Sequence, residues 1–186
     1  MPGPVFLETE RLELRTVEEE DADLVQEGRM NPEIRRYITS FRAPRSHAAV
    51  AEEVPADDGV HLFVVPRAGE HGGRSVGRAA LDHVDETDGW ANISFWLFPE
   101  AQGSGYATEA AAHLVAFGFR ERGLRRITAN AVAPNEGSIA VLGRLGFTHE
   151  GTQREKTMVD GEYVDLELYG LLRREWPGVD AVLDID

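Results

Sequence analysis

Two spacings of apolar side chains run along this chain and predict its strands and helices. Residues Arg11-Leu12-Glu13-Leu14-Arg15 alternate between polar and apolar, which is typical of a strand with one buried face. The apolar run at 61–65 also predicts a strand, which Pro66 stops. On this basis we expect seven strands, at residues 11–15, 61–65, 75–84, 90–98, 126–132, 147–157 and 163–172.

Apolar residues with the wider spacing of a helix occur in other segments. The clearest is 106–120, an alanine-rich stretch that we expect to form a buried helix. Residues 138–145 form a second apolar segment, and Gly146 stands where it can cap the C-terminal end. Shorter helices are predicted at 18–29, at 46–53 and from Asn31-Pro32-Glu33, where proline suits the first helical position.

The order of these elements predicts a single α/β domain of the α+β type over residues 1–186, built on a mixed and mostly antiparallel sheet. Three strands separated by short turns make residues 61–98 an antiparallel meander. The helix at 106–120 then joins two strands, which is typical of a strand–helix–strand crossover. The Asp160-Gly161 turn makes the last two strands a hairpin.

Composition narrows the class of protein and its surroundings. The chain has no cysteine, so disulfides, thiolate zinc sites and cysteine nucleophiles are excluded, and its six histidines show no metal-ligand spacing. No apolar run approaches the length of about 18 residues that a membrane span needs. We therefore expect a cytoplasmic protein that binds no metal and no membrane.

The charge balance adds a further expectation. The chain has 33 acidic and 19 basic residues, a formal net charge of −14, and Lys156 is its only lysine. The negative electrostatic potential of such a chain repels nucleic acid, so no nucleic-acid partner is expected. An acidic, lysine-poor surface resembles that of halophilic proteins and favours a salt-rich cytoplasm. The alternative is an ordinary solvated acidic surface in an organism with arginine-rich coding.

The most informative segment lies between the strand at 90–98 and the helix at 106–120. Here Gln102-Gly103-Ser104-Gly105-Tyr106-Ala107 forms a glycine-rich turn before a helix, an arrangement whose N–H groups suit an anion such as phosphate. A Walker A loop is excluded because the segment has no lysine. The dinucleotide fingerprint also fails, because Thr108 stands where it needs a third small residue.

A third phosphate motif does match. Gln102-x-x-Gly105-x-Ala107 resembles the pyrophosphate-binding motif of the GNAT superfamily of N-acetyltransferases, and Asn135-x-x-Ser138 followed by Gly146-Phe147 is similar to a second element of that superfamily. The two ends, residues 9–15 and 161–176, resemble the RimJ/RimL-like branch, which contains ribosomal-protein N-terminal acetyltransferases. The resemblance covers a core of about residues 7–176.

The resemblance implies a six- or seven-stranded sheet that splays open at its centre to admit acetyl-CoA. The pantetheine arm would lie beside the strand that ends at Phe98, and the pyrophosphate would lie on the glycine-rich turn. Asn135 either contacts the cofactor or merely caps a helix, and the two roles are compatible. The residues implied to bind the cofactor are Trp96, Leu97, Phe98, Gln102, Gly103, Ser104, Gly105, Tyr106, Ala107, Thr108, Asn135 and Ser138.

Acetyl transfer to an amine needs a base for the amine, a donor for the oxyanion and an acid for the departing thiolate. A backbone N–H within residues 94–97 is the expected oxyanion donor. Many GNAT enzymes use a tyrosine as this acid, at the position where this chain has Leu142. The RimL-like branch resembles this chain in having a serine three residues after the motif asparagine, so Ser138 is the candidate acid, with helix capping as the alternative. The strand position that often carries a glutamate is Asn92. The late position where the RimL-like branch carries a catalytic glutamate is Thr157, so the nearby Glu155 is the candidate base, with a water relay or capture of an already neutral amine as the alternatives.

The resemblance therefore implies acetyl transfer to a primary amine, either a protein N-terminus or a small amine such as an antibiotic. A non-catalytic acyl-CoA sensor is the alternative of a different class, since the tyrosine and the strand glutamate are missing, and a nucleotide-binding protein is a more distant one. The acceptor would lie against Tyr37, Phe41 and Arg42, and against Arg45 and the hairpin at 157–163. Monomer and homodimer both stay open.

Overall fold

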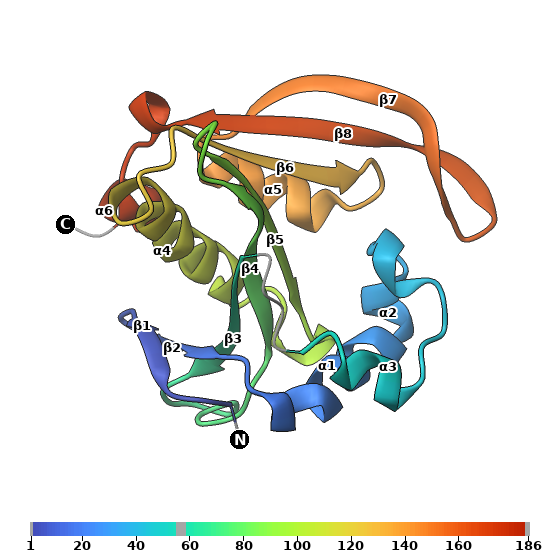
Figure 1. Cartoon of the computed structure of the whole chain (residues 1–186). Helices are drawn as coiled ribbons and strands as arrows, with labels where there is room; N and C mark the ends of the chain where they lie inside the picture. The colour runs from blue at the N-terminus through green and yellow to red at the C-terminus, as the bar shows by residue number, and fades with distance from the viewer. Residues whose placement is uncertain (1, 55–58, 185–186) are drawn as a thin grey trace.

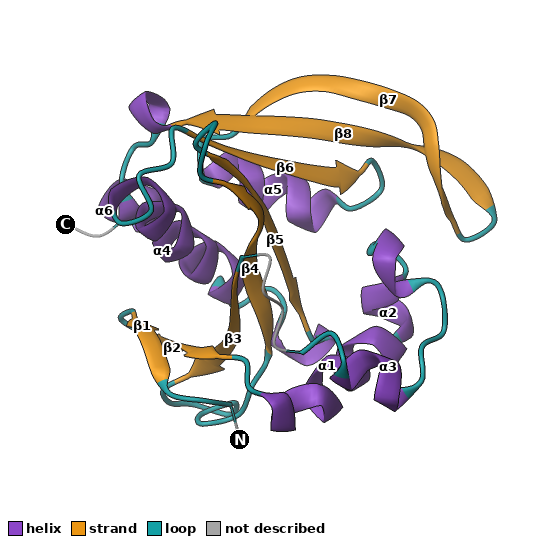
Figure 2. Cartoon of the chain, viewed as in Figure 1, coloured by secondary structure: helices purple, strands orange, loops and turns teal. Residues whose placement is uncertain are grey.

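The computed structural model describes residues 2–54 and 59–184, in which eight strands form one mixed sheet. The strand order is β1-β2-β3-β4-β5-β6-β8-β7, and every neighbouring pair is antiparallel except β5–β6 (Figures 1 and 2). The strands are β1 (Val5–Glu8), β2 (Leu12–Thr16), β3 (Val60–Pro66), β4 (Gly77–Asp85), β5 (Trp90–Leu97), β6 (Arg126–Val132), β7 (Thr148–Val159) and β8 (Glu162–Leu172).

The mixed, mostly antiparallel α+β architecture is confirmed, but the expected number of six or seven strands is wrong. The eighth strand is β1, which has only four residues and pairs only with β2. Its side chains alternate between half-buried and exposed, so none of them gives the strong apolar signal of a core strand. A short edge strand of this kind is defined by its partner rather than by its own sequence.

Five of the six α-helices in the described residues lie where the sequence predicted them, and α6 was not predicted. The α-helices are α1 (Ala22–Met30), α2 (Pro32–Arg35), α3 (His47–Ala51), α4 (Tyr106–Arg120), α5 (Glu136–Arg144) and α6 (Val179–Leu183), with 3-10 turns at Glu19–Asp21, Thr39–Phe41, Pro99–Ala101 and Arg173–Glu175. Asn31 caps α2 through Oδ1, which accepts the N–H groups of Glu33 and Ile34. None of the helices in the described ranges is long and apolar enough to cross a membrane.

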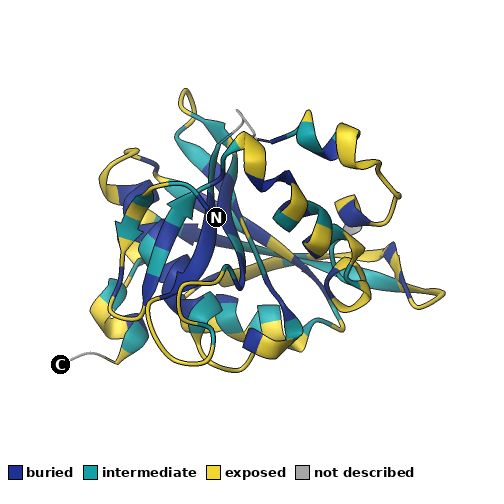
Figure 3. Ribbon diagram, turned by 90° about the horizontal axis from the view of Figure 1, so that it is seen from below, coloured by how far each residue is buried: buried dark blue, intermediate teal, exposed yellow. Residues whose placement is uncertain are grey.

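Helices cover both faces of the sheet, so its central strands are buried on both sides. In β3, Leu62 and Val64 belong to the main core beneath α4, whereas Phe63 and Val65 pack with Val25 of α1 and residues of α3. Successive side chains of a strand point to opposite faces, so the strand supplies two cores. Figure 3 shows the central strands as the buried interior, whereas the connecting turns and most of β7 are exposed.

The parallel pair β5–β6 opens partway along its length. Its register is Trp90 with Arg126, Ala91 with Ile127 and Asn92 with Thr128, and it stops there although β5 continues to Leu97 and β6 to Val132. The two strands diverge beyond this point, as Figure 1 shows. The expected central splay is therefore present, and it leaves strand edges without a neighbouring strand.

Candidate active site

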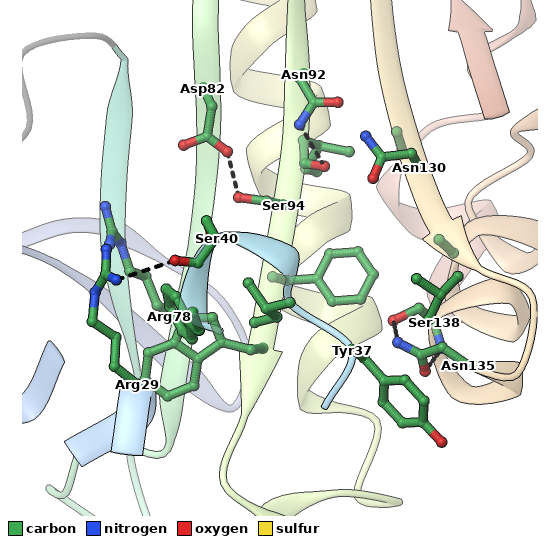
Figure 4. Close-up of a pocket in the computed structure, with 18 of the residues that line it drawn as sticks. Arg29, Tyr37, Ser40, Arg78, Asp82, Asn92, Ser94, Asn130, Asn135 and Ser138 are labelled. Carbon is green, nitrogen blue, oxygen red and sulfur yellow. Dashed lines mark hydrogen bonds between the residues drawn. The ribbon is translucent and has the colours of Figure 1, made fainter. Parts of the chain in front are cut away.

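A cleft of about 740 Å³ occupies the space where β5 and β6 diverge. One wall carries side chains of β4 and β5, the opposite wall carries β6 and α5, and the segment between α2 and α3 closes the third side (Figure 4). The polar side chains that face this space include Tyr37, Ser40, Asp82, Asn92, Ser94, Asn130, Asn135 and Ser138.

The free edge of β5 presents backbone groups to the cleft. The carbonyl of Ala91 accepts the Thr128 hydroxyl at 3.3 Å, so it faces β6, whereas the N–H of Phe98 donates to Val76 at 2.9 Å on the opposite edge. Because the backbone groups of a strand alternate in direction, those of Phe95 face the same edge as those of Ala91. The N–H of Phe95 thus lies beyond the last β5–β6 pair and points toward the cleft.

The glycine-rich turn follows β5 after the 3-10 turn Pro99–Ala101. Gly103 and Gly105 have φ angles of 75° and 79°, which residues other than glycine rarely adopt, and both glycines are exposed. Gln102 ties the turn to the strand, since its Nε2 donates to the Leu97 carbonyl at 3.1 Å. The first turn of α4, a helix of 15 residues, leaves N–H groups with no partner inside the helix. This geometry fits a pyrophosphate group.

A buried carboxylate holds this turn against the N-terminal strands. Glu109, 2% exposed, accepts the Thr9 hydroxyl at 2.5 Å, the Arg11 N–H at 2.9 Å and Arg11 Nε at 2.6 Å. Arg11 also donates Nη1 to the Ser104 carbonyl at 3.0 Å, and its guanidinium lies 5.2 Å from the Tyr106 ring centre. Sequence reasoning assigned Glu109 no role, although an acid among buried alanines was a signal.

Asn135 and Ser138 form a hydrogen-bonded pair at the start of α5. Asn135 Oδ1 accepts the Ser138 N–H at 3.2 Å, which is a helix N-cap, and Asn135 Nδ2 donates to Ser138 Oγ at 2.9 Å. Since Oγ accepts this bond, the serine hydroxyl proton is available to another acceptor. Leu142 also borders the cleft but is 1% exposed and has no proton to offer.

Asp82 is a cleft residue that sequence reasoning missed. It lies on β4 opposite Asn92 of β5, accepts the Ser94 hydroxyl, and has one carboxylate oxygen 3.5 Å from His61 Nδ1. Its side chain is 21% exposed and that of His61 is 6% exposed. The β4–β5 register is irregular beyond Asp82, and His83 has a φ of 52° there. The pairing of Asp82 with Asn92 places the aspartate at the cleft.

Glu155, the base suggested by the sequence, does not line the cleft. It is an exposed residue of β7 with a φ of 48°, and its N–H donates to Asp165 at 2.8 Å. Together with Gln153, Arg154 and Asp165 it borders a separate hollow that shares no residue with the cleft. The structure therefore does not bring Glu155 together with Ser138, and its catalytic role stays a prediction without geometric support.

The aromatic residues singled out by the sequence form one wall. Trp96 contacts Phe41 and Phe98 edge to face, with ring centres 6.4 Å and 5.4 Å apart, and its ring lies against Gly28 of α1. Tyr37 and Phe41 also line the cleft, whereas Arg42 lines a neighbouring cleft described below. The Trp96 side chain therefore faces the α1–α3 side of the sheet, on which the acceptor was expected.

Arg29 lies behind this wall. Its guanidinium is 4.7 Å from the Phe41 ring centre, donates Nη1 to the Ser40 carbonyl at 3.3 Å, and pairs through Nη2 with Glu53 at 3.0 Å. Burial lowers the pKa of Arg29, and the nearby Glu53 carboxylate partly opposes that shift. Arg29 is thus a half-buried cation that fixes the position of the aromatic wall.

Comparison with known proteins gives a consistent result. A family model described as an acetyltransferase (GNAT) domain matches residues 11–148. An uncharacterised N-acetyltransferase, p20 of Bacillus licheniformis, is 30% identical over 179 residues, which cover 92% of this chain and 98% of that protein. The putative ribosomal N-acetyltransferase YdaF of Bacillus subtilis (strain 168) is 38% identical over 106 residues, covering 57% and 58% of the two chains.

A solved structure agrees in fold. The spermidine N-acetyltransferase from Vibrio cholerae, in complex with CoA and spermine, superimposes with a TM-score of 0.79 over 90% of this chain and 98% of that chain. Its sequence identity is 20%, so the likeness concerns the arrangement of the backbone. The alignment with p20 and this superposition cover nearly the same span as the predicted core, whereas the alignment with YdaF covers 57% of the chain.

Proposed function

The chain belongs to the GNAT family and is an acetyl-CoA-dependent N-acetyltransferase, and on that premise we propose that its β5–β6 cleft joins an acetyl thioester to an amine. The observation that carries this proposal is the end of β5–β6 pairing at Asn92 and Thr128, which leaves an unpaired length of β5 that leads toward the glycine-rich turn. The opening lies along β5, and the anion-binding turn follows the same strand after the 3-10 turn Pro99–Ala101. A bound thioester would therefore reach the cleft along the free strand edge.

Acetyl-CoA supplies the activated acetyl group, and the residues of this chain hold it. The N–H groups of the Gln102–Ala107 turn and of the first turn of α4 would bind the pyrophosphate, with Arg11 and Glu109 keeping that turn in place. The exposed glycines leave room for close approach, because nothing lies within 4 Å of a Cβ built on Gly103. These features support the cofactor assignment made for residues 102–108.

Three groups would serve the chemistry. The Phe95 N–H at the free edge of β5 would stabilise negative charge developing on the carbonyl oxygen. The Asp82 carboxylate would accept a proton from the attacking amine, and the Ser138 hydroxyl would donate to the departing sulfur. Asp82 and Ser138 come from β4 and α5, on opposite walls of the cleft (Figure 4).

The acceptor is a primary amine, and the names of the similar proteins point to different molecules that bear this amine. One relative is named a putative ribosomal N-acetyltransferase, and the superimposed structure holds spermine. A protein N-terminus and a polyamine are therefore the two candidate acceptor classes. The wall of Tyr37, Phe41 and Trp96 would receive the part of the acceptor next to its amine.

The direct test is acetyl-CoA turnover with a panel of amines, measured as free CoA thiol and as acetylated product by mass spectrometry. We expect CoA release that depends on the amine. We also expect acetyl-CoA at a hundredfold excess over its Kd to stabilise the fold by about 2.7 kcal/mol. Stabilisation without turnover of any amine would instead support the sensor alternative. Stabilisation by ATP but not by acetyl-CoA would contradict the proposal altogether.

The same assay tests the role given to Asp82. Asp82→Asn keeps the shape of the side chain but removes the proton acceptor, so we expect kcat/KM near neutral pH to fall about 10²-fold. The deficit should shrink at higher pH, because an already neutral amine needs no base. Asp88→Asn, in the exposed β4–β5 turn, is the matched control. An equal loss at every pH would contradict the assignment.

A further inference from the structure

We infer that the acceptor of this enzyme carries negative charge beside its reacting amine, which deepens the proposed function and rests on it. The observation is a second cleft, of about 630 Å³, that shares Arg29 and Phe41 with the first. It lies between the α1–α3 region and the turn of the β7–β8 hairpin at residues 158–161. An acceptor with its amine in the first cleft would extend into the second.

The charge of this second cleft is opposite to that of the whole chain. Among the described residues, five arginines line it, namely Arg29, Arg35, Arg36, Arg42 and Arg45, and Asp160 is the one acidic residue. Counting also Glu53, which pairs with Arg29 and Arg45, the positive charges exceed the negative ones by three. More than a quarter of the 19 basic residues thus gather at one cleft of a protein whose net charge is −14.

Two of these arginines are available to a ligand. Arg29 and Arg45 share Glu53, and Arg36 pairs with Asp160 at 2.5 Å. Arg35 and Arg42 are exposed, and no ion pair joins either of them to another residue of the described ranges. Free guanidinium groups at a cleft next to the amine site are suited to carboxylate or phosphate oxygens.

This arrangement discriminates between the two acceptor classes. The mean field of an acidic protein attracts a polyamine, yet the local field beside the active site repels it. An anionic acceptor is repelled by the remaining surface and attracted only at this cleft, where each favourable pair also fixes its orientation. The exposed Met30 and Met158 add apolar surface at the same place. The shared chemistry is an amine with a nearby anion, carried by an acidic peptide or by a small molecule.

The experiment compares acceptors that differ only in charge. Three amidated tetrapeptides begin with serine and continue with three glutamates, three glutamines or three arginines, and spermidine is assayed beside them. At low salt we expect kcat/KM to be about tenfold or more higher for the glutamate peptide than for the arginine peptide. O-phosphoethanolamine against ethanolamine tests whether a small anionic amine shares the preference. A preference for the arginine peptide or for spermidine would overturn the inference.

Charge reversal locates the effect. Arg42→Glu and Arg35→Glu should each lower the glutamate-to-arginine ratio several-fold while acetyl-CoA binding stays unchanged. Arg173→Glu, an exposed arginine in the turn that follows β8, changes the net charge equally and should leave the ratio as it is. Equal ratios in all three variants would overturn the inference while leaving the proposed function intact. Absence of turnover with every amine would overturn the proposed function itself.

Discussion

At the residue scale, the pair Asn135–Ser138 joins a structural role to a chemical one. The sequence left two interpretations of each residue open: cofactor contact or helix cap for Asn135, and proton donation or helix cap for Ser138. The structure confirms the cap, because Asn135 Oδ1 accepts the Ser138 N–H at 3.2 Å. The second bond, from Asn135 Nδ2 to Ser138 Oγ, leaves the serine proton directed elsewhere. Capping by Asn135 and proton donation by Ser138 are therefore compatible.

Ser138→Ala separates these roles. Removing a donor used mainly on the departing thiolate should lower kcat by about 10²-fold with little change in acetyl-CoA affinity. The N-cap is made by Asn135 and the Ser138 backbone, so the alanine variant should keep its thermal stability. Steady-state kinetics, isothermal titration and a melting curve measure the three quantities. Full turnover in the variant would remove Ser138 from the mechanism and favour an ordered water.

A companion variant, Asn135→Asp, tests the hydrogen bond to Ser138 without removing the cap. An aspartate keeps the capping oxygen but replaces the Nδ2 donor with an acceptor, which would draw the Ser138 proton toward itself. We expect stability close to that of the original chain and reduced turnover. Asn135→Ala loses the cap as well, and should lower the free energy of unfolding by about 1 kcal/mol.

Sequence reasoning about individual residues succeeded where chemistry and local geometry coincide. The turn from Gln102 to Ala107 was predicted because glycines, strand end and helix start are contiguous. Asp82 was missed because its place in the cleft depends on pairing with Asn92 ten residues away and on the irregular register beyond it. The cleft arginines were only partly anticipated, as Arg42 and Arg45, because the lining combines residues 26–45 with residues 158–161.

At the element scale, the interior helix and strand of the crossover were predicted to the residue, at 106–120 and 126–132. Both are strongly apolar and have clear ends. Helix α5 begins at Glu136 rather than at residue 138, where the apolar segment begins, and its cap is Asn135, as the sequence suggested. β1 and α6 were not predicted, because such short elements form through contacts with β2 and α4.

The turn before α4 is the element whose backbone conformation matters most. Gly105 has a φ of 79°, and a Cβ built there lies 3.2 Å from Arg11 Nη2. Gly105→Val should therefore strain the turn, disturb the Arg11 contact and raise the Kd for acetyl-CoA by more than tenfold. Titration calorimetry measures the affinity, and a melting curve shows that the fold persists.

A suitable control is Gly123→Val, in the loop after α4. Gly123 has a similar φ of 68°, and no atom lies within 4 Å of a Cβ built on it. Its backbone strain is comparable, so both variants should lose similar stability, whereas only Gly105→Val should lose acetyl-CoA binding. Equal affinity in the two variants would place the phosphate site elsewhere.

At the scale of the whole molecule, charge acts in two opposing ways. The excess of 33 acidic over 19 basic residues makes the surface repel itself, which destabilises the folded state at low salt. The second cleft reverses this locally with its five arginines. Global repulsion and local attraction are both screened by salt, but they affect different measurements, so one titration can separate them.

Raising the salt concentration from about 0.1 M to about 1 M shortens the Debye length from about 10 Å to about 3 Å. We expect the thermal midpoint to rise over this range, because screening relieves the repulsion among the acidic side chains. We expect the preference for the glutamate peptide to fall over the same range, because screening weakens its attraction to the exposed Arg35 and Arg42. Sucrose raises stability without screening charge and serves as the control. A thermal midpoint that does not change with salt would contradict the halophilic interpretation of the acidic surface. A preference for the glutamate peptide that does not change with salt would show that acceptor choice depends on shape rather than on charge.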